Sequence, residues 1–125
     1  MEARIDYTSV LRAFVDQGID FAVAGGFAVV AHGPIRVTMD LDLALADEKG
    51  MKAASFFHEK QPFLVVDLLF TEEFRFTKKN IEYIPLFGIE CPVLDIPTLI
   101  KLKTIAGREK DLDDINALKM LIKKT

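Results

Sequence analysis

The spacing of apolar residues predicts a helix near the start of the chain. Residues 6–17 carry apolar side chains at the spacing of one helix face; these are Val10, Leu11, Phe14 and Val15. Gly18 follows at a point where helices commonly end in a left-handed residue. The apolar run Phe21–Ala24 then predicts a short strand. After this strand, Gly25-Gly26 predicts a turn and residues 27–32 predict a short helix.

Residues 37–45 alternate strictly between apolar and other side chains, which is the period of a strand with two different faces. One face carries Val37, Met39, Leu41, Leu43 and Leu45, and the other carries Thr38, Asp40, Asp42 and Ala44. This is the clearest strand in the sequence. We therefore expect the two aspartates to lie on one face of a sheet and the apolar side chains to face the core.

Further strands are expected in the middle of the chain. Met51–His58 and Phe63–Phe70 are two apolar segments, and Gln61-Pro62 forms the break between them. A hairpin is expected within Glu82–Leu94. These segments, together with the two strands already predicted, contain enough β-structure for a sheet.

The last third of the chain predicts two helices. Pro97 suits the first turn of a helix that runs to Ala106 and stops at Gly107. A final helix is expected to begin near Asp111. No repeat, low-complexity tract or linker divides the sequence, so residues 1–125 are expected to form one domain, with the ten phenylalanines in its core.

The composition excludes several classes of protein. A net charge of -3 and a pI near 5.4 argue against a large basic face that binds nucleic acid by counterion release. Residues 1–10 show no signal-peptide pattern, and the longest apolar run, Phe21–Ala31, is well short of the roughly 20 residues that span a bilayer. With Cys91 alone, neither an intrachain disulfide nor a thiolate zinc site can form. We expect a cytoplasmic protein without a membrane partner.

Three aspartates predict a metal site. Asp40 and Asp42 share a strand face with side chains about 7 Å apart, so both can lean toward one hard cation. Asp67 interrupts the apolar run of residues 63–70, where an ionised carboxylate is costly unless it is paired, metal-bound or at the edge of a site. Converging strand carboxylates suit two-metal phosphoryl chemistry, and magnesium suits such ligands. The alternative interpretation of the aspartate pair is a solvent-exposed face that happens to carry two acids.

Gly25-Gly26 is a candidate phosphate contact. The pair lies between a predicted strand and a predicted helix, where backbone amides can approach phosphate oxygens with no side chain in the way. A simple turn is the alternative interpretation. Neither the dinucleotide pattern G-x-G-x-x-G nor a P-loop ending in G-K-[ST] is present, so the sequence favours neither a dehydrogenase nor a P-loop enzyme.

Taken together, these motifs resemble the DNA polymerase β-like nucleotidyltransferase superfamily, in which a glycine motif precedes a D-x-D strand and a later third aspartate. The matching residues are Gly25, Gly26, Phe27, Ala28, Gly33, Arg36, Thr38, Asp40, Asp42 and Asp67. The segment Leu102–Asp111, followed by Asp114, resembles the carboxyl-terminal helices of the branch that contains the abortive-infection toxin nucleotidyltransferases. The likeness covers residues 20–118. It departs from the family between Ala46 and Met51, where the family carries a longer connection with a helix.

The resemblance implies a fold, a cofactor and a donor. The implied fold is α/β (α+β), a mixed β-sheet with flanking helices. The cofactor is Mg²⁺ or Mn²⁺, and the donor is a nucleoside triphosphate (NTP). By the same resemblance, Gly25 and Gly26 contact the triphosphate, Asp40 and Asp42 bind metal, and Asp67 binds metal or activates the acceptor.

The tail supplies four further candidates. Lys103 matches a family lysine and can neutralise a phosphate as a point charge, although a solvated helix charge is an alternative interpretation. Arg108, Lys110 and Asp111 are candidate nucleotide contacts. The same cluster also suits a solvated helix start with Asp111 as its cap.

Two residues before the aspartate pair are placed to assist it. Arg36 and Thr38 can reach phosphate or support the aspartates, and Thr38 shares the strand face of Asp40. The two histidines, His32 and His58, have no partner pattern and are expected to be structural.

The sequence leaves three hypotheses about function. The first is an active nucleotidyltransferase that moves a nucleoside monophosphate and releases pyrophosphate, and the three intact aspartates favour it. The second is a catalytically silent nucleotide-binding or toxin–antitoxin partner module of the same fold, with an antitoxin-type protein as its partner. The third is a plain α/β interaction domain, which leaves Asp67 and the glycine turn unexplained. The acceptor stays open among RNA, a protein hydroxyl and a small molecule.

Asp67 also constrains the order of the strands. If residues 46–50 formed a tight turn, the three predicted strands would form a meander, with the strand of Asp67 two places, or about 9.6 Å, from that of Asp42. Neighbouring strands about 4.8 Å apart would let both side chains share an ion. We therefore expect the two strands to be neighbours. Because displacing the third strand needs a connection longer than five residues, we expect residues to be missing from this numbering between Ala46 and Met51.

Overall fold

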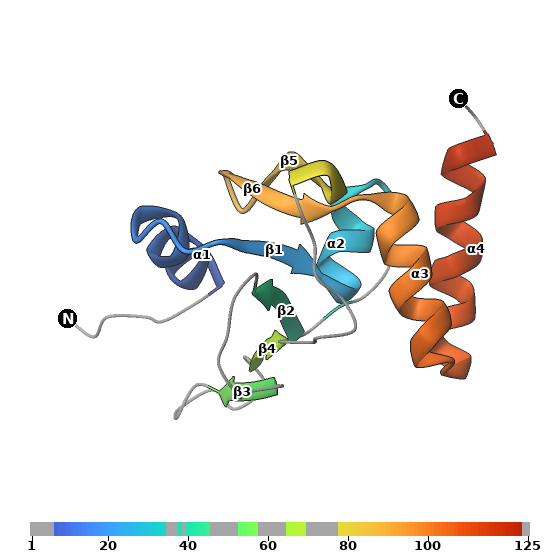
Figure 1. Ribbon diagram of the computed structural model, residues 1–125, viewed down its shortest axis with the longest axis horizontal. Helices are drawn as coiled ribbons and strands as arrows, with labels where there is room; N and C mark the ends of the chain where they lie inside the picture. Colours follow the sequence, from blue (N-terminus) through green and yellow to red (C-terminus); the bar gives the residue numbers. More distant parts are fainter. Residues whose placement is uncertain are drawn as a thin grey trace.

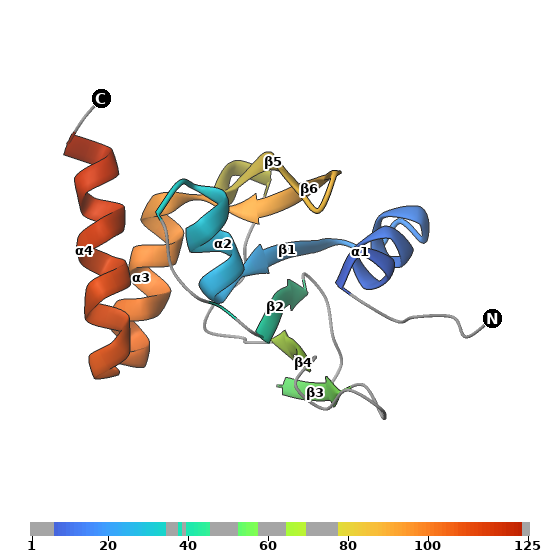
Figure 2. The same ribbon diagram turned by 180° about the vertical axis from the view of Figure 1, so that it is seen from behind.

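The structure is a computed structural model that describes residues 7–34, 38, 40–45, 53–57, 65–69 and 78–123, without side-chain detail at 53–57, 69 and 78. Over these residues a mixed six-stranded sheet is flanked by helices, as the resemblance implied (Figure 1). The helices are α1 (Tyr7–Asp16), α2 (Gly25–Ala31), α3 (Ile96–Ala106) and α4 (Glu109–Lys123), with a short 3-10 helix, η1 (Lys78–Asn80). Seen from either side, α1 lies at one end of the molecule, while α3 and α4 lie together at the other (Figure 2). None of the described helices has the length and apolar character needed to span a bilayer.

The strand order of the sheet is β3-β4-β2-β1-β6-β5. The strands are β1 (Phe21–Ala24), β2 (Asp40–Leu45), β3 (Ala53–Phe57), β4 (Val65–Leu69), β5 (Ile81–Leu86) and β6 (Ile89–Leu94). At its centre, β1 runs antiparallel to β2 and parallel to β6, and β2 runs parallel to β4. The outer strands β3 and β5 run antiparallel to their neighbours. The predicted adjacency of the two aspartate strands, β2 and β4, is thereby confirmed.

Glycines end the helices where the sequence predicts. Gly18 (φ 67°) follows α1, and Gly107 (φ 62°) ends α3, so both occupy the left-handed region that favours glycine. At the start of α3, the side chain of Asp95 accepts a hydrogen bond from the backbone N–H of Thr98 at 2.9 Å. The predicted hairpin is also present, because Phe87 (φ 52°) and Gly88 (φ 76°) form a two-residue turn with positive φ at both positions.

The core lies between the central strands and the helices. Val23, Leu41, Leu43 and Val93 are fully buried, and so are Leu11 of α1, Val29 of α2 and Leu118 of α4. The predicted apolar face of β2 is confirmed at Leu41 and Leu43, which are buried, and Leu45 is half-buried. The opposite face runs from Asp40, which is exposed, to Ala44, which is buried. The assignment of every phenylalanine to the core is wrong for Phe87, which is 45% exposed at the hairpin turn.

Three predicted boundaries move. The glycine pair is not a separate turn, because α2 begins at Gly25 directly after β1. The strand expected at 37–45 is described as β2 from Asp40 onward; Thr38 precedes it, and residues 37 and 39 lie outside the described residues. The last helix begins at Glu109 rather than near Asp111.

Seven positions, residues 46–52, separate β2 from β3, which lies beyond β4 in the sheet. A displaced third strand was expected to need more than five connecting residues, and the strand bounds agree with that requirement. The break expected between Ala46 and Met51 lies outside the described residues.

Candidate active site

Two of the three predicted aspartates meet on neighbouring strands. Asp42 of β2 lies directly opposite Asp67 of β4 in the parallel register. Because hydrogen-bonded strands are about 4.8 Å apart, paired side chains on one face come within reach of each other. A hydrogen bond joins the two carboxyl groups. The long-range sheet pairing therefore turns two acids 25 positions apart in the numbering into one carboxylate pair.

Asp40 lies at the edge of this pair. It is exposed at the start of β2, opposite Val65 in the register. Residues two apart on a strand point to the same face, and the negative charge of Asp40 acts on Asp42. Within the described residues, however, no group of three or more His, Cys, Asp or Glu side chains is arranged to hold a metal ion. The structure thus assembles two carboxylates in contact and a third acid close enough to influence them.

The electrostatics of the pair follow first from burial and then from the proximity of the other acids. The pKa of Asp42 is raised from its ordinary 3.8 to about 6, first by burial, then by the charge and hydrogen bond of Asp67 and the charge of Asp40, while the charge of Lys103 opposes these effects. Adjacent carboxylates resist simultaneous ionisation. A cation among these oxygens would relieve the repulsion, and carboxylate oxygens are the ligands that Mg²⁺ and Mn²⁺ prefer. The carboxylate pair therefore offers oxygen ligands of the kind that a divalent metal prefers.

Gly25 leaves room for Asp42. The two residues are brought together because Ala24, the last residue of β1, pairs with Asp42 across the sheet. A Cβ atom at position 25 would overlap the Asp42 carboxylate oxygen Oδ2 and lie 2.8 Å from its Cγ. Gly25 also has a φ of 61°, which disfavours any other residue. The glycine motif and the aspartate motif, read as separate signals in the sequence, are in direct contact.

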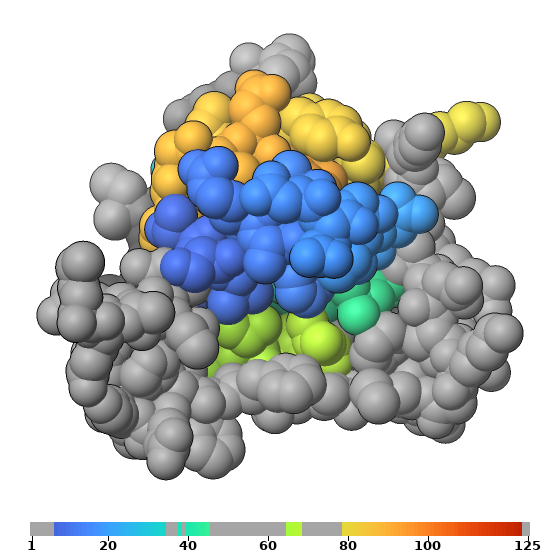
Figure 3. Space-filling model, turned by 90° about the vertical axis from the view of Figure 1, so that its left-hand side faces the viewer, coloured from blue at the N-terminus to red at the C-terminus, as the bar shows by residue number. Residues whose placement is uncertain are grey.

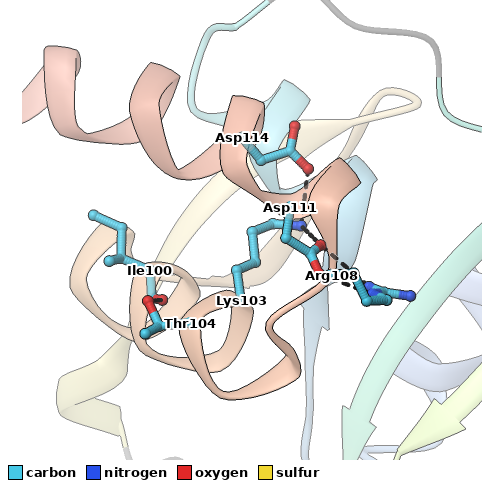
Figure 4. A network of polar contacts seen from close by, with 6 residues as sticks. All are labelled: Ile100, Lys103, Thr104, Arg108, Asp111 and Asp114. Atoms are coloured by element: carbon cyan, nitrogen blue, oxygen red, sulfur yellow. Dashed lines mark hydrogen bonds and ion pairs between the residues drawn. The ribbon is translucent and has the colours of Figure 1, made fainter.

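Lys103 of α3 is the centre of a buried ionic network with α4 (Figure 4). Its ammonium Nζ lies 2.9 Å from Asp114 Oδ2 and 3.4 Å from Asp111 Oδ1. Lys103 is only 7% exposed and Asp111 only 2%. The alternative interpretation of Lys103 as a solvated charge is therefore wrong. So is that of Asp111 as a helix cap, because it lies inside α4 and its carboxylate binds two cations.

Arg108 extends this network to the solvent. Its Nε donates to Asp111 Oδ2 at 2.8 Å and its Nη2 to Oδ1 at 3.2 Å, while 57% of its side chain stays exposed. Burial alone would raise the pKa of Asp111, but the hydrogen bond from Arg108 and the charges of Lys103 and Arg108 lower it. The charge of Asp42 contributes to the raised pKa of Arg108, after the hydrogen bond to Asp111. The basic residues therefore lie within electrostatic range of the carboxylate pair.

The other predicted residues take different places. Gly26 is buried as the second residue of α2, Lys110 is exposed on α4, and Thr38 is half-buried just before β2. Arg36 and His58 lie outside the described residues. His32 is structural, as predicted: Nε2 donates to the carbonyl of Leu94 at 2.8 Å, and Nδ1 lies 3.4 Å from the carboxylate of Glu82.

Tyr7 is a neighbour of the carboxylates that the sequence analysis missed. Its hydroxyl accepts a hydrogen bond from the backbone N–H of Val65, the first residue of β4, at 3.2 Å. The pKa of Tyr7 is raised, first by burial and then by the charges of Asp40, Asp42 and Asp67, against the lowering effect of the Val65 bond. Tyr7 continues the helical spacing of the apolar residues in α1, so the pattern indicates only a core position. The one signal for this contact in the sequence was that a buried tyrosine hydroxyl needs a hydrogen-bond partner.

Comparison with known proteins identifies the fold. No protein-family model matches the chain, and no curated protein sequence is significantly similar to it. Among solved structures, the lincomycin-bound lincosamide antibiotic adenylyltransferase LnuA aligns with a TM-score of 0.68 and 13% identity over 91% of this chain and 94% of that one. ANT(2″)-Ia in complex with adenylyl-2″-tobramycin aligns with a TM-score of 0.63 and 13% identity over 90% and 85% of the two chains.

A third similar structure is that of the putative nucleotidyltransferase TM1012 from Thermotoga maritima. It aligns with a TM-score of 0.56 and 14% identity over 95% of this chain and 94% of that one. At such low identities, the three alignments establish a common fold. The chain therefore has the fold of nucleotidyltransferases, over nearly its whole length.

Proposed function

We propose that the protein is a metal-dependent nucleotidyltransferase that moves a nucleoside monophosphate from an NTP to a hydroxyl group of an acceptor. The observation that carries the proposal is the carboxylate pair Asp42–Asp67 on adjacent parallel strands, with the Cβ-free backbone of Gly25 against it. This arrangement lies in a fold shared with the lincosamide antibiotic adenylyltransferase LnuA and with ANT(2″)-Ia, whose structure contains adenylyl-2″-tobramycin. Because a fold alone does not imply an activity, the proposal rests on the chemistry of these residues as well as on the fold.

The acidic residues would hold the metal. Asp42 and Asp67 would be the main ligands and Asp40 the third, because its charge already acts on Asp42. Mg²⁺ or Mn²⁺ at this position would neutralise charge on the triphosphate and on the departing pyrophosphate. The raised pKa of Asp42 favours this interpretation, since burial and the neighbouring acids both disfavour its ionised form and a cation would stabilise that form.

The glycines and the basic residues would bind the triphosphate. Gly25 presents backbone without a side chain beside Asp42, and Gly26 follows it as the second residue of α2. Arg108 has a guanidinium more than half exposed within electrostatic range of Asp42, so phosphate oxygens can reach it. Lys103 is buried between two aspartates, so it would act through its positive charge and by fixing α3 to α4.

The remaining assignments follow from these. Asp111 would orient Arg108, while Thr38 and Lys110, with Arg36, would form outer contacts to the nucleotide. In the transfer, the acceptor oxygen bonds to the α-phosphorus as the bond to pyrophosphate breaks. The hydroxyl proton passes to Asp67, which lies next to Asp42.

A transfer assay with α-³²P-labelled NTPs and Mg²⁺ or Mn²⁺ tests the proposal. The acceptor panel should contain RNA, a protein fraction, and the antibiotics lincomycin and tobramycin that occur in the similar structures. The wild type and an Asp113→Asn control, altered at an exposed aspartate of α4, should label the same acceptor. Asp42→Asn and Asp67→Asn should not.

Absence of label with every acceptor, or full activity of Asp42→Asn, would contradict the proposal. Binding of an NTP without any transfer would instead support the catalytically silent module. In the protein fraction, a labelled band would identify a protein acceptor, whereas an antitoxin-type partner of the silent module would carry no label.

A further inference from the structure

Tyr7 joins α1 to the strand that carries Asp67. The residue is 9% exposed, and its hydroxyl accepts the backbone N–H of Val65 across 58 positions of sequence. Val65 is the first residue of β4 and lies opposite Asp40 of β2. Figure 3 shows the atoms of α1 (blue) directly over those of β4 (yellow-green). The Tyr7 hydroxyl thus adds a contact to the beginning of this strand, beside its pairing with β2 and β3.

The same side chain is anchored to the glycine helix. The ring of Tyr7 packs edge-on against Phe27 of α2, with centroids 5.3 Å apart and planes at 75°. Phe27 is two residues after Gly25, whose backbone lies against Asp42. The ring also contacts Phe87 at 6.2 Å. Because the ring is fixed on α2 and the hydroxyl on β4, Tyr7 links the helix whose first residue, Gly25, lies against Asp42 to the strand that carries Asp67.

The hydrogen bond at Val65 lies close enough along β4 to influence the position of Asp67. Two residues of a strand span about 6.6 Å and place their side chains on the same face. The phenol remains neutral, since burial and the nearby aspartates raise its pKa. Its hydroxyl therefore fixes the strand without adding negative charge to the acidic cluster.

We propose that Tyr7 is a positioning residue: by binding the Val65 amide, it sets the place of Asp67 relative to Asp42 and Gly25. Its catalytic consequence rests on the proposed nucleotidyltransferase function. Residues that orient metal ligands typically contribute about tenfold or more to metal affinity or activity. The position of β4 itself does not depend on that function and can be observed directly.

Tyr7→Phe isolates the hydroxyl, because phenylalanine keeps the ring contacts. Tyr83→Phe on β5 is the matched control, since Tyr83 is the other tyrosine of the chain and is 64% exposed. Amide hydrogen exchange measured by NMR should show the Val65 amide exchanging about fivefold or more faster in Tyr7→Phe. Chemical-shift changes should extend to Asp67. In the control, both residues should remain as in the wild type.

Functional readouts complete the test. In Tyr7→Phe, Mn²⁺ affinity measured by electron paramagnetic resonance and kcat should each fall about tenfold, with the KM for NTP changed less than about twofold. Shift changes confined to Val65, or unaltered exchange there, would overturn the proposal even if the wild type transfers no nucleotide. If the wild type is active and Tyr7→Phe equals it in kcat and Mn²⁺ affinity, the positioning role fails while the proposed function stands.

Discussion

Replacing Gly25 by alanine should destabilise the fold and displace Asp42 in one step. The backbone term arises because Gly25 has a φ of 61°, where an L side chain costs about 1–2 kcal/mol. The steric term arises because the new Cβ would overlap Asp42 Oδ2 and lie 2.8 Å from Cγ; overpacking of this kind adds about 1–3 kcal/mol. The free energy of unfolding should therefore fall by about 2–5 kcal/mol.

Gly18→Ala measures the cost of the strained backbone separately from the steric cost of the new Cβ atom. Gly18 has a φ of 67°, close to that of Gly25, but a Cβ there would meet nothing within 4 Å among the described residues. It should lose only the backbone term of about 1–2 kcal/mol. Urea unfolding measures both variants, and for a chain of 125 residues each kcal/mol corresponds to about 4 °C in Tm.

A double-mutant cycle with Asp42→Ala tests whether the extra cost of Gly25→Ala comes from contact with the Asp42 carboxylate. Once the Asp42 carboxylate is removed, Gly25→Ala should cost no more than Gly18→Ala, because only the strained φ remains. Equal costs for the two glycine variants in the protein that retains Asp42 would show that position 25 does not press on the carboxylate. The proposed contact between the glycine motif and the aspartate site would then be wrong.

Three further predictions concern other ionisable groups. Because the folded pKa of Asp42 is raised to about 6 from 3.8, its contribution to stability is fully present below pH 3.8 and is lost as the pH rises through 6. The free energy of unfolding of metal-free Asp42→Asn should therefore depend less on pH over this range than that of the wild type. Mg²⁺ should stabilise only the wild type. Lys103→Met should lower the free energy of unfolding in urea by about 3–5 kcal/mol, because it removes the cation that lies between the buried carboxylates of Asp111 and Asp114, whereas Lys101→Met, at an exposed position of α3, should change it little. Cys91 is fully buried with a pKa raised by burial, so a thiol reagent should label it only after denaturation, and rapid labelling of the native protein would contradict its placement.

Part of the candidate site could be read from local pattern. Asp40 and Asp42 alternate with leucines, which places both on one strand face by the period of two. Asp67 stands out because a charge within an apolar strand requires a partner. The expected proximity of Asp67 to Asp42 came from the reach of side chains, and the register of β2 and β4 confirms it.

The environment of Lys103 could not be read in this way. Its spacing on α3 suits a solvated lysine as well as a buried one, because a lone charge in a helix pattern carries no information about what packs against it. The packing of α4 on α3 brings Asp111 and Asp114 to its ammonium and excludes water. Two alternative interpretations, of Lys103 as a solvated charge and of Asp111 as a cap, failed for this one reason.

The sequence by itself determined the elements, because periods of two and 3.6 residues, glycine stops and turn residues act over a few positions. It also determined which residues could carry the chemistry, since few side chains suit a hard cation. Only the tertiary structure decided which of these residues meet. Tyr7 reaches Val65 across 58 positions, and a Cβ at Gly25 is excluded by Asp42. Such contacts depend on strand order and helix packing, which arise from the summed burial of the whole core and leave no signature in any short segment.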